Sequence, residues 1–246
     1  MIKIIALREL KSLFLSPLAW AMLVVMQLIM CYQFLTQLET YLQLQAKLSV
    51  LEASPGITDL VIAPLLGGAA IILLLIVPLL TMRLISEEQK NQTLPLLFSA
   101  PVSMTQIILG KYLGVLGFLF ILVIMIALMP LSLILGAAID LGQLLSALLG
   151  LILVLASFAA AGLYMSTLTR QPAIAAVSSF GLLLFLWIIN WSAGGGNALT
   201  WFSLLTHFEP LLKGIFSTAD IAYYLLFICL FLVLSVRRLE RLRLPH

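Results

Sequence analysis

Charged residues are scarce in this sequence. Only 9% of its 246 residues are Asp, Glu, Lys or Arg, and 63% are hydrophobic. A soluble globular domain carries roughly 25% charged residues, because its surface faces water. The composition therefore excludes an ordinary soluble domain and predicts a membrane protein.

Cysteine and histidine are also rare. Cys31 and Cys229 each fall inside a predicted span with no histidine near them, so they form neither a disulfide framework nor a metal site. His207 and His246 fall outside the spans, and we expect His207 to be solvated or interfacial. The sequence has no HExxH zinc motif and no membrane nucleophile with a base beside it. We therefore predict no catalytic residue and no bound metal.

The GxxxxGK(S/T) loop that cradles nucleotide phosphates is absent as well. We expect no cofactor in this chain, and any ATP and Mg²⁺ to bind another polypeptide. Ionisable residues are missing from the span interiors, which weakens an ion-coupled carrier, because such carriers normally keep ionisable groups at membrane depth. Backbone carbonyls can bind sodium, so this class stays open.

Long neutral runs fill most of the chain. About 20 apolar residues cross the hydrocarbon core as a helix, and charged positions leave five runs of at least that length and a shorter one at 221–236. The short run can span if its helix continues to Arg237, whose side chain can reach the interface. We predict an all-α membrane protein with one transmembrane domain over 1–246. Its six spans are expected at approximately 18–38, 60–82, 112–134, 141–165, 172–191 and 219–237.

The run 171–208 is long enough to hold two spans. Glycines at 194–196 and interface-type tryptophans interrupt it, so we interpret it as one span and a hairpin of short interfacial helices. With six spans, eleven of the thirteen Lys and Arg share one side, and only Lys47 and Lys213 lie opposite. Cytoplasmic loops carry the Lys/Arg excess, so we predict both termini in the cytoplasm. The net charge of +3 thus reports topology and is no argument for nucleic acid.

The opening segment MIKIIALRELKSLF has an apolar helical face, with Arg8 and Lys11 on the other face. It predicts an interfacial elbow helix, after which Pro17 turns the chain into the bilayer. A topology anchor and a partner-binding role are both open. Further along, residues 39–59 suggest a short external helix.

Proline and small residues mark three of the spans. Pro78 removes one backbone hydrogen bond from the second span and is expected to kink it about a turn earlier, as a hinge or only as shape. Small residues let helices approach closely. They occur at 67–70 and 159–162, and at Gly110, Gly114 and Gly117.

The connection between the second and third spans is unusually polar. Two S-x-x-Q capping boxes, at 86–89 and 103–106, predict two helix starts, with Glu87 and Glu88 in a first turn where acidic side chains favour the helix dipole. Pro95 predicts a break near Thr93-Leu94. We expect a helix-break-helix elbow over 83–103 at the cytoplasmic surface, with an apolar ridge of leucines.

The string MRLISEEQKNQTLPLLFSAPVSMTQIILGK resembles the cytoplasmic elbow of ABC-2-type transporter permeases. That pattern has an acidic pair, a basic residue, Gly-Thr, leucines, Pro-Val-Ser and Gly-Lys. Gln92 departs from it where glycine is usual, and Pro95 where an acidic residue is usual. RELKSLFLSPLAW and HFEPLLKGIFSTADIAYY also resemble family segments, so the likeness covers nearly the whole chain. It is strongest to the short six-span permeases linked with gliding motility and with copper-site maturation of a nitrous-oxide-reducing system.

The resemblance implies a permease dimer, of two copies or of homologues, bound to two separate ATPase subunits at a bacterial inner membrane. ATP hydrolysis would drive export or a mechanical change. The alternative is a non-transporting scaffold that assembles extracytoplasmic partner proteins. The elbow would be the coupling element seated in the ATPase, although its acidic pair can also be read as a merely solvated first turn. The coupling residues implied are Glu87, Glu88, Lys90, Thr93, Leu96, Leu97 and Pro101.

Overall fold

The computed structural model describes residues 1–48, 56–94, 102–135, 139–192 and 201–243. Within these ranges every regular element is a helix, and six helices are long and apolar enough to cross a membrane. The predicted all-α fold with six spans is therefore confirmed. In chain order the elements are α1 (Ile2–Leu15), α2 (Pro17–Leu48), the π-helical turn η1 (Thr58–Ile62), α3 (Ala63–Thr81), α4 (Ser86–Lys90), α6 (Met104–Ser132), the 3₁₀ turn η2 (Leu133–Leu135), α7 (Leu141–Leu168), α8 (Pro172–Ser192), α9 (Leu204–Leu212) and α10 (Thr218–Arg243).

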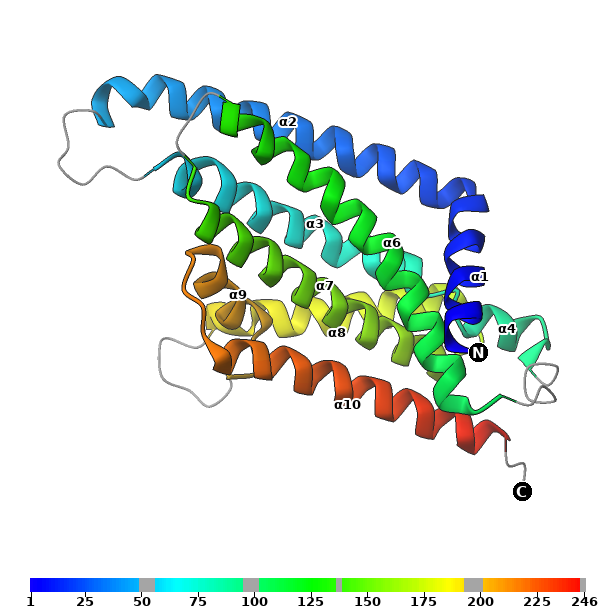
Figure 1. Ribbon diagram of the computed structural model, residues 1–246. Helices are drawn as coiled ribbons and strands as arrows, with labels where there is room; N and C mark the ends of the chain where they lie inside the picture. Colours follow the sequence, from blue (N-terminus) through cyan, green and yellow to red (C-terminus); the bar gives the residue numbers. More distant parts are fainter. Residues whose placement is uncertain (49–55, 95–101, 136–138, 193–200, 244–246) are drawn as a thin grey trace.

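The long helices lie side by side, with α7 at the centre of the bundle (Figure 1). This helix packs against α3, α6, α8, α9 and α10. It can occupy this position because the small residues at 159–162 leave room for its neighbours, and all four of them are buried. The N-terminus and the last turn of α10 lie at the end of the bundle that also holds α4, and α1 runs crosswise there (Figure 1).

Helices extend beyond the predicted spans. α2 has 32 residues, which at 1.5 Å per residue is about 48 Å, against about 30 Å for the hydrocarbon core. The short external helix expected within 39–59 is therefore wrong as a separate element, since α2 continues without interruption to Leu48. α6 begins at Met104, where the second capping box predicts a helix start, and so it extends before the span expected from 112. Charged residues mark where the bilayer ends, whereas backbone hydrogen bonds continue the helix past that point.

The predicted small-residue contacts are present. A Cβ at Gly68 would overlap the side-chain amide of Gln33, so glycine lets α3 approach α2. A Cβ at Gly162 would overlap the hydroxyl of Thr81, which brings α7 equally close to α3. These two contacts fix the spacing of the three helices.

His207 is buried, so the solvated alternative is wrong, while its interfacial position stays a prediction. Its Nδ1 lies 2.6 Å from Asp220 Oδ1, and its Nε2 lies 3.2 Å from the carbonyl oxygen of Trp201. The ring stacks on Tyr223 with centroids 4.1 Å apart. α9 folds back against α7 and α8, which carries His207 to the start of α10. In the sequence, His207 and Asp220 are two separate polar residues near the edges of spans. Only the tertiary fold brings them into contact.

Candidate functional site

The elbow begins on the surface of α7. The hydroxyl of Ser166 accepts hydrogen bonds from the backbone N–H groups of Ile85 and Ser86, both at 3.0 Å. It also donates to the carbonyl of Met82 at 3.1 Å. One residue further along α7, the carbonyl of Thr167 accepts a hydrogen bond from Gln89 Nε2 at 3.1 Å. α7 therefore fixes the position at which α4 starts.

These bonds overturn one of the two predicted capping boxes. The hydroxyl of Ser86 donates to the carbonyl of Met82 and caps nothing, and Gln89 is engaged with α7. Ser166 accepts the N–H groups of Ile85 and Ser86, whereas the Gln89 N–H that a Ser86 cap would have bonded donates to the carbonyl of Ile85. The second box begins as predicted, because Ser103 Oγ accepts the N–H of Gln106 at 3.3 Å at the start of α6.

The first elbow helix ends at Lys90, earlier than the predicted break near Thr93-Leu94. Gln92 has a φ of 56°, in the left-handed region. The N–H of Thr93 donates to the carbonyl of Glu88 at 3.0 Å, and that of Gln92 to Gln89 at 3.4 Å, which is the hydrogen bonding of a Schellman motif. Glycine is preferred at such a position because it lacks a Cβ. Gln92, which replaces the glycine usual in the ABC-2-type pattern, therefore occupies the position at which the backbone most favours glycine.

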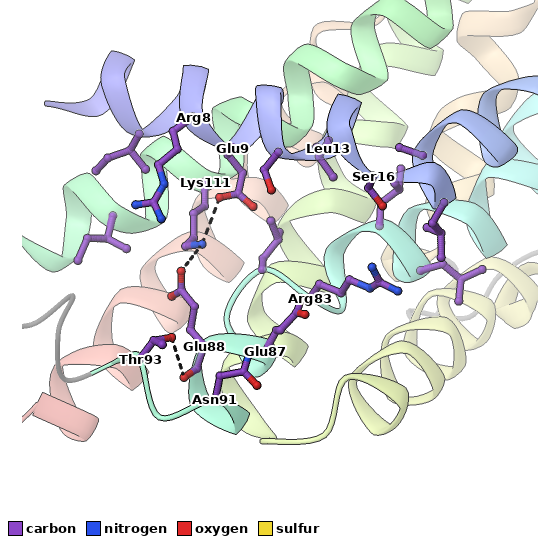
Figure 2. A pocket seen from close by; sticks show the side chains of 18 residues that line it. Arg8, Glu9, Leu13, Ser16, Arg83, Glu87, Glu88, Asn91, Thr93 and Lys111 are labelled. Atoms are coloured by element: carbon purple, nitrogen blue, oxygen red, sulfur yellow. Dashed lines mark hydrogen bonds and ion pairs between the residues drawn. The ribbon is translucent and has the colours of Figure 1, made fainter.

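Lys111 lies at the centre of the site. Its side chain is buried, although it carries a charge two turns into α6. The ammonium nitrogen lies 2.8 Å from Glu88 Oε1 and 3.3 Å from Glu9 Oε2 (Figure 2). Two carboxylates from two other helices thus compensate a buried charge that would otherwise be costly. We call these three residues the Lys111 bridge.

Two residues of the bridge were absent from the predicted coupling set. Lys111 ends the Gly-Lys pair of the family-like string, so a signal for it was present. The sequence marks Glu9 only as the single acidic residue of the first helix. Nothing local indicates that it faces Lys111, which is 102 residues away in sequence.

Glycines bring Glu9 to Lys111. A Cβ at Gly114 would lie 2.7 Å from the Cβ of Glu9, and one at Gly110 would lie 2.7 Å from the Cβ of Ile5. α1 therefore rests directly on the glycine face of α6, as the small residues predicted. Its apolar face contacts protein, whereas Arg8 and Lys11 on the opposite face are exposed. The indole of Trp20 donates to the carbonyl of Phe14 at 2.7 Å and fixes the turn into α2, which begins at Pro17.

A cavity of about 370 Å³ separates α1 from the turn between α3 and α4 (Figure 2). We call it the elbow cavity. Its walls are part apolar and part charged, and the Lys111 bridge lies at its edge. The lining residues are Ile5, Arg8, Glu9, Ser12, Leu13, Ser16, Leu18, Ala19, Leu79, Leu80, Arg83, Leu84, Glu87, Glu88, Asn91, Thr93, Ile107 and Lys111.

The other predicted site residues lie in four different places. Glu87 and Lys90 are exposed on α4 and border a crevice of about 580 Å³ next to the start of α8. Thr93 Oγ1 donates to the carbonyl of Glu88 at 3.4 Å. Pro78 lies within the last turn of α3, and the kink expected there stays a prediction. Leu96, Leu97 and Pro101 lie outside the described residues.

Comparison with known proteins supplies the remaining observation. Residues 3–243 match the family model described as ABC-2 family transporter protein. No curated protein gives a match to the chain. The family match spans nearly the whole chain and agrees with the likeness carried by its elbow.

Proposed function

Because this chain belongs to the ABC-2 family of transporter proteins, we propose that it works as the permease subunit of an ABC transporter whose ATPase subunits dock on the 83–103 elbow. The chain is a multi-pass membrane protein with six helices of spanning length. The family match supports a non-catalytic membrane subunit, and ATP with Mg²⁺ binds in the separate ATPase. Hydrolysis there drives export or a mechanical change across the membrane.

The attachment of α4 carries this proposal. α4 exposes Glu87 and Lys90, while its other side is bonded to α7 through Ser166 and to α6 through Lys111. A soluble partner that contacts the exposed side can therefore displace two membrane-spanning helices. A merely solvated turn would not need such attachment.

The arrangement of charge supports a cytoplasmic location for this end. α1, α4 and the end of α10 lie together (Figure 1), and most of the Lys and Arg residues of the chain belong to these elements or to the connections at the same end. Following the Lys/Arg rule, we place both termini in the cytoplasm of a bacterium, with the spans in its inner membrane.

The assembly we propose contains two permease chains, as a homodimer or with a homologue, and two ATPase subunits. An extracytoplasmic protein can join it at the opposite end. From the resemblance of the elbow alone, we further propose the short six-span type linked with gliding motility and copper-site maturation.

Co-purification of the ATPase with the full-length chain tests the docking. We expect Leu96→Asp with Leu97→Asp to abolish it, because two charges would replace the apolar ridge. Leu242→Asp is the matched control, since Leu242 is a partly exposed leucine at the same end but outside the elbow. ATPase retained by the double variant, or lost equally with the control, would refute docking at the elbow.

A catalytically dead ATPase separates this function from the scaffold alternative. A scaffold assembles its extracytoplasmic partners normally with a dead ATPase, whereas a permease that works through ATP hydrolysis loses its activity. Normal activity with the dead ATPase would favour the scaffold.

A further inference from the structure

Three helices that are distant in sequence meet at one ammonium group. Lys111 on α6 contacts Glu88 on α4 and Glu9 on α1. We propose that Lys111 is the positioning residue that transmits displacement of α4 to α1, so that the N-terminal helix moves with the elbow during the ATP cycle. This inference rests on the proposed function, because it needs an ATPase that displaces α4.

The elbow cavity interrupts the packing between α1 and the turn before α4. Residues of α1 form one of its walls, and Glu87, Glu88 and the turn before α4 form another (Figure 2). Open space of about 370 Å³ therefore lies between the two elements. Side-chain packing is interrupted by this space, so the ionic contacts at its edge link α4 to Lys111 on α6 and to Glu9 on α1.

The chemistry of lysine suits this role. The ammonium group has three donors on a flexible stem, so it can keep two carboxylates bound while the helices shift slightly. Among the described residues, Glu88 Oε2 is buried without a hydrogen-bond partner. The carboxylate of Glu88 is thus held through its other oxygen, at 2.8 Å from Lys111.

The fit of α1 on α6 completes the transmission. At Gly110 and Gly114 the two helices touch without intervening side chains. Glu9 lies on the contacting face, so a change in the position of Lys111 acts on the backbone of α1 at short range. Because Trp20 is bonded to the end of α1, the first span follows.

A distance measurement on the reconstituted complex tests the proposal. Spin labels are attached at Leu7→Cys on α1 and Val177→Cys on α8, both exposed, after Cys31→Ser and Cys229→Ser remove the native thiols. The distance distribution is recorded for the permease with its ATPase, without nucleotide and with ATP trapped by vanadate. We expect a nucleotide-dependent shift with Lys111 present, and its loss in Lys111→Met, which keeps the stem but removes the charge.

Further variants make the result specific. Lys111→Arg should restore the shift, Glu9→Gln should reduce it with α4 still docked, and Lys3→Met, which removes an exposed charge of α1, should leave it unchanged. ATPase binding is measured for each variant by co-purification. A full shift in Lys111→Met, or no shift in the ATPase-bound complex with Lys111 present, would overturn the proposal. ATPase binding lost in Lys111→Met would also overturn it, because Lys111 would then support docking and not transmission.

Failure of the proposed function gives a different result. In that case no ATPase co-purifies even with the chain that carries Lys111 and an intact elbow. The inference about α1 would then fail together with the proposed function. The variants would not differ from the chain with Lys111 in the distance between the spin labels.

Discussion

The hydroxyl oxygen of Ser166 accepts a hydrogen bond from the backbone N–H of Ser86, with 3.0 Å between oxygen and nitrogen, although the two residues are 80 positions apart in the sequence. The same hydroxyl serves the N–H of Ile85. The start of the elbow is therefore defined by α7 and not by its own sequence. Any movement of α4 therefore either breaks this hydrogen bond or moves the end of α7 with it.

Ser166→Ala should loosen the elbow. The substitution leaves two buried backbone N–H groups without their acceptor, and each buried donor left unsatisfied costs about 1–3 kcal/mol. We expect a lower free energy of unfolding in mixed detergent micelles and faster hydrogen exchange at 85–90. Ser132→Ala is the control, because the Ser132 hydroxyl bonds only within its own helix at an exposed position. Equal effects of the two variants would contradict the assigned role of Ser166.

Gln92→Gly should stabilise the turn after α4. A residue with a Cβ in the left-handed conformation is strained by about 1 kcal/mol, and glycine is not. The matched variant is Asn91→Gly, one residue earlier, where φ is −82° and glycine brings only extra freedom to the unfolded chain. We expect opposite signs for the two changes in the free energy of unfolding. A destabilising Gln92→Gly would contradict the left-handed conformation.

Gly114→Ala should separate α1 from α6. The new methyl group would lie 2.7 Å from Glu9 Cβ and 3.0 Å from the carbonyl oxygen of Ala6, so the helices must move apart. Overpacking of this kind costs about 1–3 kcal/mol. Protease cleavage within α1 should accelerate.

Gly117→Ala provides the internal comparison. Its methyl group would meet Leu10 at 3.5 Å, an ordinary contact. Replacement of glycine in a helix interior gains up to about 1 kcal/mol of helix propensity. We expect unchanged or slower cleavage of α1 in this variant. Similar cleavage in both variants would rule out the close contact at Gly114.

The His207–Asp220 contact should be energetically coupled. A double-mutant cycle with His207→Gln and Asp220→Asn is expected to give a coupling energy within about 0.5–3 kcal/mol, as for residues in direct contact. The exposed Glu39→Gln combined with His207→Gln should be additive. Unfolding monitored by tryptophan fluorescence measures both cycles. Additivity at Asp220 would show that the buried contact contributes nothing to stability.

The sequence predicts those features that depend on local composition. Spans follow from runs of neutral residues, because the bilayer excludes charge along a whole helix. The Ser103 cap follows from residues close in sequence, and the small residues at Gly110 and Gly114 predict close helix packing from size alone, although not that α1 is the partner. In each case the relevant signal lies within a few turns of chain.

The features that the sequence does not reveal depend on partners far along the chain. The predicted cap at Ser86 fails because its hydroxyl donates to the carbonyl of Met82 and its N–H bonds to Ser166. Glu9 has a charged partner only because α1 lies beside Lys111. His207 looks like a solvated residue until α9 folds back onto α10. Tertiary packing therefore decides the polar contacts of the candidate site, whereas local pattern decides its helices.

Accessibility of the elbow from outside an intact cell tests the account most directly. Single cysteines are placed at Lys90→Cys on the elbow, Arg241→Cys near the C-terminus and Lys213→Cys at the opposite end, with both native cysteines replaced by serine. A membrane-impermeant maleimide is expected to label position 213 in intact cells, and positions 90 and 241 only after the membrane is opened. Labelling of position 90 or 241 in intact cells would place the elbow away from ATP and contradict the mechanism.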